Sequence, residues 1–164
     1  MKDFWKLVFS VGVSLSAGVI GSFFTTPAVQ SSWYLELVKP SLNPPSWVFG
    51  TVWTTLYVLM GISLFLVWKQ HSDILQNVGM LRIWKVGIVA FFVQLVLNTL
   101  WSIIFFGLHS PGGALVEIVF LWLAILATIF AFYKISKPAA CLLLPYILWV
   151  SFASYLNYTI WVLN

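Results

Sequence analysis

Charged positions divide this chain into five long segments that are almost free of charge. The segments are continuously apolar and do not alternate between apolar and polar residues, so the pattern favours helices over strands. A helix needs about 20 apolar residues to cross a hydrocarbon core about 30 Å thick. The five segments run from Leu7 to Leu35, Pro40 to Trp68, Val86 to Val116, Ile118 to Tyr133 and Pro138 to Asn164.

This pattern predicts an all-α membrane protein, a bundle of five transmembrane helices in a single domain that spans residues 1–164. The fourth segment is long enough to cross only if Glu117 lies near the end of its helix. The expected helices cover residues 5–24, 47–68, 83–106, 113–133 and 139–162, and residues 25–46 form a connection that folds back as a lid.

Composition agrees with a membrane protein, since 62% of the residues are hydrophobic and 7% are charged, whereas soluble domains carry about 25% charge. Cys141 is the sole cysteine, which excludes an internal disulfide and a site built on a cysteine pair. No metal site is expected. The pattern contains no phosphate-binding loop, no dinucleotide glycine signature and no catalytic triad.

Basic residues predict the orientation, because they are enriched on the cytoplasmic side of membrane proteins. Seven of the eight basic residues lie at the amino end or in the second and fourth connections, and Lys39 alone lies on the opposite side. The amino terminus is therefore expected in the cytoplasm. The net charge of +4 is then explained by the membrane topology and by contact of basic residues with the lipid bilayer. We therefore expect no nucleic-acid partner.

The connection before the second helix is stiff and aromatic. Pro40, Pro44 and Pro45 fix φ and remove backbone donors, so the chain between Lys39 and Ser46 cannot be regular helix. Trp33 lies in the same connection. These residues are expected to form the lid.

Aromatic and amide side chains recur at helical spacing in three of the expected helices. Trp53 and Tyr57 are four residues apart in the second helix. In the third helix Gln94, Asn98, Trp101 and Phe105 share one face. Because an amide is costly in hydrocarbon without a partner, this face is expected to serve either an interhelical hydrogen bond or a ligand.

The fifth helix is expected to kink or loosen at Pro145. Trp149, Ala153 and Asn157 recur every four residues and would either line a groove or seat a neighbouring helix. Together, these stripes predict an aromatic, weakly polar pocket suited to a flat and largely apolar ligand.

Three further features favour structural roles. Ala17 and Gly21 have the spacing of small residues at close helix contacts, either within the bundle or in a dimer. His109 is expected to be solvated in a turn, and Glu117 to complement the positive end of the fourth helix.

Three blocks of the chain resemble one known family. WYLELVKPSLNPPSWVFGTVWTTLY (residues 33–57), QLVLNTLWSIIFFG (94–107) and KPAACLLLPYILWVSFASYLNYTIW (137–161) are similar to signatures of the TspO/MBR family, the tryptophan-rich sensory and translocator proteins also known as peripheral-type benzodiazepine receptors. The blocks occur in the family's order and span nearly the whole chain.

The resemblance implies a homodimer that binds porphyrins such as protoporphyrin IX, as well as isoquinoline or benzodiazepine ligands, with no required cofactor. It implies a function in tetrapyrrole handling and stress response in a bacterial inner membrane. By match to the family's motifs, the pocket would be lined by Trp53, Tyr57, Asn98, Trp101, Trp149, Ala153, Leu156 and Asn157, with Trp33, Pro44 and Pro45 in the covering loop.

Two alternative functions stay open at the level of the sequence. One is light- and oxygen-dependent breakdown of porphyrin, for which the resemblance indicates Trp53 and Trp149 as redox residues. The other is transport of porphyrin or another small apolar ligand, although paired intramembrane ionisable residues are lacking. Sterol binding through the vertebrate motif is not expected, because Thr159 and Val162 replace its aromatic and basic residues.

Overall fold

A computed structural model describes residues 2–164, and this part of the chain contains helices and no strand. Five helical spans within it are long and apolar enough to cross a membrane, which confirms the predicted fold class. The long elements are α1 (Lys2–Val29), α3 (Ser46–Lys69), α5 (Val78–Ser102) with the π-helical segment η1 (Ile103–Gly107), α6 (Pro111–Ile135), and α7 (Lys137–Leu142) followed by α8 (Leu144–Leu163). Short helices α2 (Ser32–Glu36) and α4 (His71–Ile74) lie in the connections.

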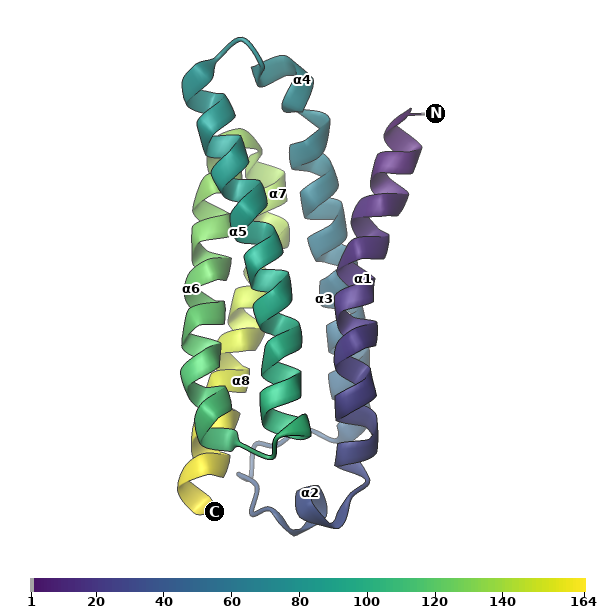
Figure 1. The fold of residues 1–164 in the computed structure, drawn as a ribbon, viewed down its shortest axis with the longest axis vertical. Coiled ribbons are helices and arrows are strands. Elements are labelled where there is room, and N and C mark those ends of the chain that lie inside the picture. The colour runs from purple at the N-terminus through teal and green to yellow at the C-terminus, as the bar shows by residue number, and fades with distance from the viewer. Residues whose placement is uncertain (1) are drawn as a thin grey trace.

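The long helices lie side by side, and their connections alternate between the two ends of the bundle (Figure 1). α1 packs on α3 and α5, α5 packs on α6, and α6 packs on α8. α3 packs on α7. The amino terminus and α4 lie at one end, and the carboxyl terminus and α2 lie at the other (Figure 1).

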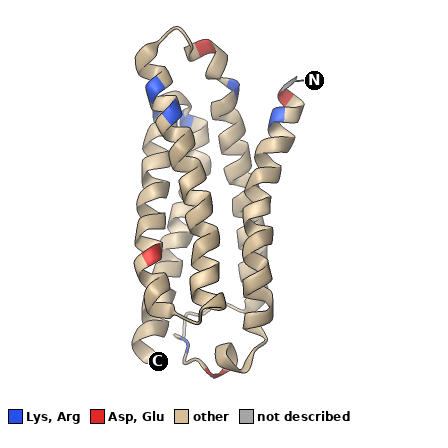
Figure 2. Ribbon diagram, in the orientation of Figure 1, with Lys and Arg blue, Asp and Glu red and all other residues tan. Residues whose placement is uncertain are grey.

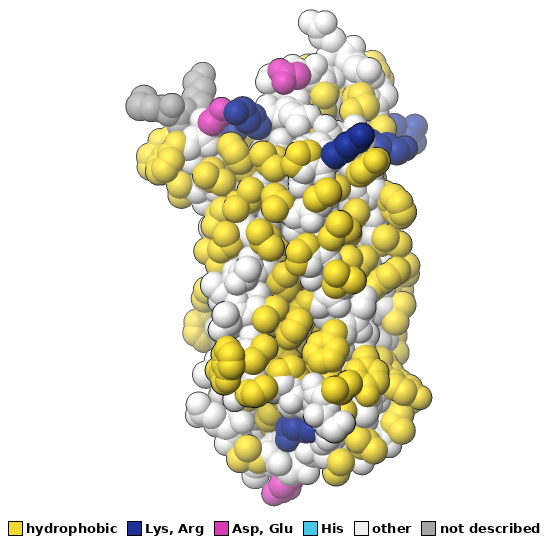
Figure 3. Space-filling model, turned by 180° about the vertical axis from the view of Figure 1, so that it is seen from behind, with side chains coloured by type: hydrophobic (Ala, Val, Ile, Leu, Met, Phe, Trp, Pro, Cys, Tyr) yellow, Lys and Arg dark blue, Asp and Glu magenta, His cyan; other side chains and the backbone are white. Residues whose placement is uncertain are grey.

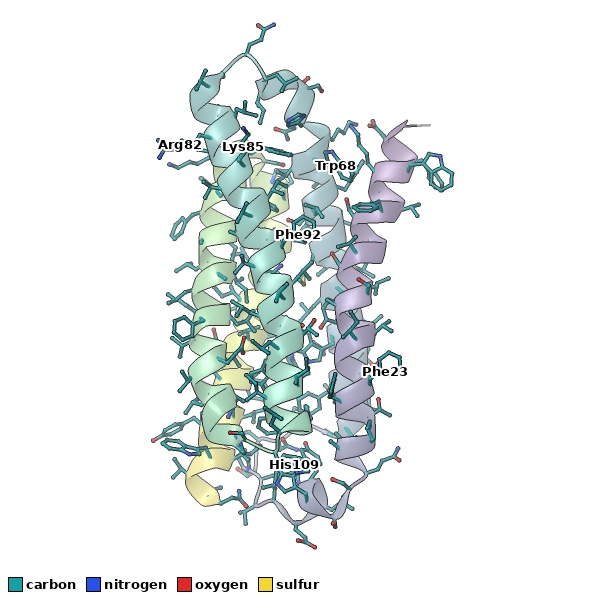
Figure 4. All side chains as sticks on the ribbon, viewed as in Figure 1. Phe23, Trp68, Arg82, Lys85, Phe92 and His109 are labelled. Carbon is teal, nitrogen blue, oxygen red and sulfur yellow. The ribbon has the colours of Figure 1, made fainter. Side chains whose placement is uncertain are left out.

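The outer surface of the bundle is apolar between two charged ends. Figure 3 shows hydrophobic side chains over most of the length of the molecule and charged side chains near its two ends. Basic positions gather at the end that carries α4 (Figure 2), where Arg82 and Lys85 project from α5 (Figure 4). Many apolar side chains are exposed on this surface, and Phe23, for example, is 73% exposed, as expected for contact with lipid. The protein is an integral membrane protein.

The first helix is longer than the sequence analysis predicted. It was expected to cover residues 5–24, but α1 runs from Lys2 through Pro27 to Val29. A proline removes its own backbone donor and disturbs the turn before it. Because two helical residues follow Pro27, the loss is confined to the last turn. The connection therefore covers residues 30–45, shorter than the predicted 25–46, and contains α2.

The last span is broken rather than evenly curved. α7 ends at Leu142, α8 begins at Leu144, and Pro145 occupies the first turn of α8. Proline is favoured there because the first helical N–H groups have no intrahelical acceptor. The break lies before the stripe that begins at Trp149, within a single apolar span of Lys137–Leu163.

Glycines of α1 and α3 allow a close approach within the bundle. A Cβ at Gly61 would lie 2.5 Å from the Cα of Val11, and a Cβ at Gly18 would overlap the Tyr57 ring. A Cβ at Gly21 would lie 3.2 Å from Ser102 Oγ. The small residues of α1 therefore serve packing inside the bundle, and they bring α1 against the aromatic side chains of α3.

Candidate functional site

Four buried polar side chains from α3, α5 and α8 form a continuous hydrogen-bonded chain. The Tyr57 hydroxyl donates to Asn98 Oδ1. Asn98 Nδ2 donates to the Tyr146 hydroxyl at 3.2 Å. The Tyr146 hydroxyl in turn donates to Gln94 Oε1 at 2.8 Å. Both amides of α5 are thus bonded across the bundle, Asn98 through its oxygen and its nitrogen and Gln94 through its oxygen, which lowers the cost of burying them in hydrocarbon.

Trp53 covers this chain with an aromatic face. Its ring stacks on Tyr57 with centroids 5.6 Å apart, and it meets the edge of Tyr146 at 6.1 Å. Flat rings at the surface of a polar core offer both stacking and hydrogen bonds to a ligand. The structure therefore brings together Trp53, Tyr57 and Asn98, which the sequence analysis nominated from two helices.

A second polar contact joins α5, α6 and α8 nearer the end that carries α2. Trp101 Nε1 donates to Asn157 Oδ1 at 3.0 Å, and Asn157 Nδ2 donates to the Pro111 carbonyl at 2.7 Å. Trp101 also stacks on Phe105 with centroids 5.0 Å apart. Both Trp101 and Asn157 therefore face the interior.

Trp149 lies apart from these hydrogen bonds, at a groove between α3 and α8. The groove has a volume of about 550 Å³ and is lined by apolar and threonine side chains that include Thr51, Leu148 and Trp149. Phe49 meets the Trp149 ring edge-on at 5.9 Å. The indole nitrogen of Trp149 is buried and has no hydrogen-bond partner among the described residues.

Ala153 and Leu156 complete the stripe of α8. Leu156 is buried, and Ala153 packs, partly buried, against the main hydrophobic core. Both side chains are apolar, so they offer packing contacts and no hydrogen bonds. The small side chain of Ala153 lies one helical turn from Trp149 and one from Asn157.

The connection around α2 closes the end of the bundle. Trp33 stacks on His109 with ring centroids 4.1 Å apart, and it meets the edge of Phe105 at 6.0 Å. His109, which was expected to be merely solvated, is exposed but forms part of this contact; Figure 4 shows it beside the α2 end. Because Phe105 also stacks on Trp101, aromatic contact is continuous from the connection to the interior.

Polar contacts hold the same connection in place. Asn164 accepts from the Val38 N–H at 3.0 Å and donates to the Val38 carbonyl at 3.1 Å. Lys39 Nζ donates to the Tyr34 and Leu37 carbonyls and lies over the Tyr34 ring. Burial raises the pKa of the Tyr34 hydroxyl, with a hydrogen bond from Asn43 in opposition, so Tyr34 is neutral at physiological pH.

The two nominated prolines lie where the connection enters α3. Pro44 is half-buried and Pro45 is exposed. Pro45 caps α3 with extended backbone angles of φ −55° and ψ 145°. They determine the path of the chain into α3, which carries Trp53 and Tyr57.

The sequence analysis missed one central residue and undervalued two. Tyr146 is 1% exposed and joins both amides of α5, yet only its spacing from Trp149, three residues, could have indicated this. Gln94 and Phe105 were placed on the interior face of the third helix. The contact of Phe105 with Trp33 could not be predicted from helical spacing, because Trp33 lies in the connection around α2.

Glu117 was assigned to the end of its helix, but the structure buries it. Its side chain is in α6 and is 6% exposed. Neither carboxyl oxygen has a hydrogen-bond partner among the described residues. Glu117 lies in the second turn of α6, where an acid complements the helix dipole as expected, but the sequence did not indicate that its carboxyl group would be buried without a partner.

The interior of the site is aromatic and weakly polar. Within residues 2–164 no group of three or more His, Cys, Asp or Glu side chains is placed to hold a metal ion. The interior instead offers indole and phenol rings, the three amides of Gln94, Asn98 and Asn157, and one carboxyl group. These features define a small helical membrane protein with an aromatic and weakly polar interior beneath a folded connection.

Comparison with known proteins identifies the group to which this architecture corresponds. The sequence profile of the TspO/MBR family matches residues 10–162, and the chain belongs to this family. It is 47% identical to the tryptophan-rich protein TspO of Chlorobaculum tepidum over 167 residues, which cover 99% of this chain and 98% of that protein. It is 42% identical to the human translocator protein over 129 residues, 79% of this chain and 73% of that protein. The tryptophan-rich sensory protein of Cereibacter sphaeroides is 36% identical, with 88% of this chain and 85% of that protein covered.

Proposed function

We propose that this TspO-type membrane protein binds a flat, largely apolar tetrapyrrole, with protoporphyrin IX as the test ligand, between α3, α5 and α8. One observation carries the proposal: aromatic faces and polar edges from three separate spans meet in the membrane interior, at Trp53, Tyr57, Asn98 and Tyr146. A macrocycle would stack on the Trp53 ring and would form hydrogen bonds with the amide and phenol groups.

The ligand would lie with its charged edge toward the connection around α2. The propionate groups of protoporphyrin IX are anionic, and Lys39 is the one basic residue in that connection. Lys39 Nζ already donates to two backbone carbonyls there, so a carboxylate would replace weaker acceptors. The apolar edge would face the interior.

We expect protoporphyrin IX to quench the tryptophan fluorescence of the purified protein in a saturable manner. Trp149→Phe and Trp53→Phe, tested separately, should each weaken binding by about two- to tenfold, since stacking and edge contacts of an indole are worth about 0.5–1.5 kcal/mol beyond the area that they bury. Affinity would be measured by titration in nanodiscs, with ligand absorbance as a second readout.

Trp47→Phe is the matched control. Trp47 precedes the proposed site on α3, is 70% exposed and lies at the bundle surface, so its loss should leave the affinity unchanged. The proposal fails if the protein shows no saturable binding, or if all three variants bind protoporphyrin IX as the unmodified protein does.

The proposed topology follows from charge. The end that carries Lys69, Arg82 and Lys85 faces the cytoplasm of a bacterial inner membrane, together with the amino terminus. The connection around α2 then faces the outside, where it covers the proposed site. As part of the same proposal, the protein works as a homodimer.

A further inference from the structure

Glu117 is the acidic residue of the membrane-spanning segments that lies inside the bundle. Acidic positions in Figure 2 lie near the two ends of the molecule, apart from one on α6. The Glu117 side chain is 6% exposed, and both of its oxygens lack a hydrogen-bond partner within the described chain. Burial of a carboxyl group without a partner is expensive, so a functional reason for this residue is expected.

Contacts between α6 and α8 fix the depth of Glu117 from one side. Asn157 Nδ2 donates to the Pro111 carbonyl at 2.7 Å, and Trp122 Nε1 donates to Ser151 Oγ at 3.0 Å. Glu117 lies midway between Pro111 and Trp122 on α6, so its level on α8 is midway between Asn157 and Ser151. That level is Ser154, which is next to Ala153 of the nominated stripe.

Contacts between α5 and α6 give the same depth from the other side. Gly113 faces Ile104, and Phe132 stacks on Phe91 with ring centroids 5.9 Å apart. Interpolation along these antiparallel helices places Glu117 at the level of Trp101 on α5. Glu117 is thus in the layer of the bundle that contains Trp101 and Ser154.

Two other buried polar atoms left unpaired in the described chain lie on α5 and α8, the helices that pack on α6, and both are hydrogen-bond donors. Gln94 Nε2 and Trp149 Nε1 are buried without partners in the described chain. They match ligand acceptors, whereas the two Glu117 oxygens match ligand donors. A ligand that completes the site therefore needs an N–H group on the side that faces α6.

We propose that Glu117 is a recognition group for the N–H donor of a protonated nitrogen heterocycle or aromatic amine, a ligand class in addition to the anionic porphyrin. The inference rests on the proposed function, because it needs a flat ligand to occupy the interior between α3, α5 and α8. The carboxyl group provides a charge-assisted hydrogen bond, which exceeds a neutral one in strength. A cationic ring is thereby favoured over an uncharged ring of the same shape.

Two tricyclic probes of similar shape test this inference on the full chain in nanodiscs of zwitterionic lipid. 9-Aminoacridine is a cation with N–H donors, and 9-methylanthracene has neither charge nor donor. We expect Glu117→Gln to weaken 9-aminoacridine binding by about tenfold or more, in keeping with hydrogen bonds to charged groups. Binding of 9-methylanthracene should change by less than about twofold, because it makes no polar contact.

Glu36→Gln is the matched control, since it removes the same charge from an exposed residue of α2. Both probes should bind this variant as they bind the unmodified protein. Glu117→Met keeps the length of the side chain and removes both oxygens, so it should fold and show the same selective loss if Glu117→Gln does not fold.

The outcomes separate this inference from the proposed function. Unchanged 9-aminoacridine affinity in Glu117→Gln and Glu117→Met overturns the role of Glu117, whereas saturable protoporphyrin IX binding in the same preparation leaves the proposed function intact. Equal loss of both probes in these variants also overturns the inference, because it indicates a packing role. Failure of protoporphyrin IX to bind the unmodified protein defeats the proposed function itself.

Discussion

Replacement of Gly61 by alanine is expected to lower the free energy of unfolding by about 1–3 kcal/mol, the usual cost of overpacking a filled interior. The new Cβ would lie 2.5 Å from the Val11 Cα and 2.9 Å from the Val11 backbone nitrogen. Backbone atoms cannot rotate away as a side chain can, so α1 and α3 must separate. Thermal unfolding in detergent, followed by circular dichroism, measures this loss.

Gly50→Ala is the control on the same helix. Gly50 is exposed, and a Cβ there meets no atom within 4 Å. Because alanine is favoured over glycine in a helix by about 1 kcal/mol, this variant should match or exceed the stability of the unmodified protein. Equal behaviour of the two variants would show that α1 and α3 do not approach as closely as described.

Replacement of Asn98 by leucine has the second large expected effect. Asn98 is 3% exposed, accepts from the Tyr57 hydroxyl and donates to the Tyr146 hydroxyl. Leucine has a similar size but leaves the Tyr57 hydroxyl without its acceptor, and Tyr146 keeps only its bond to Gln94 Oε1. We expect a loss of about 2 kcal/mol in the free energy of unfolding, within the range for unsatisfied buried groups, and a parallel loss of protoporphyrin IX affinity.

A double-mutant cycle with Tyr57→Phe separates the hydrogen bond from packing. If the two groups are bonded, Tyr57→Phe should destabilise the unmodified protein and cost much less when Asn98 is already leucine. Additive losses would contradict a direct bond between Tyr57 and Asn98. The cycle needs no ligand, so its outcome is independent of the proposed function.

Charge spacing was enough to predict the number and type of the long helices, because a membrane excludes most charged residues from its interior. It was not enough to predict where helices end. The first helix was expected to end at residue 24, but α1 continues through Pro27, which lies in its last turn, where the lost backbone hydrogen bond affects only the helix end. Prolines affect a helix according to their distance from its ends, and that distance is unknown before the ends are known.

In the candidate site, helical spacing predicted which residues share a face but not which residues of other helices they contact. Helical spacing placed Asn98 and Trp101 on one interior face, and their hydrogen bonds with Tyr57 and Asn157 agree with that placement. Spacing within one helix cannot reveal which helix lies opposite. For this reason Tyr146 was missed, and the burial of Glu117 became visible only when α6 was packed against α5 and α8.

A structure of the protein with protoporphyrin IX bound is the most direct test of the claim that the interior between α3, α5 and α8 is the ligand site. We expect the macrocycle to contact Trp53, Asn98 and Trp149, with its propionates toward Lys39. A macrocycle held only on the lipid-facing surface of the bundle, with the hydrogen bonds of Asn98 unchanged, would contradict it.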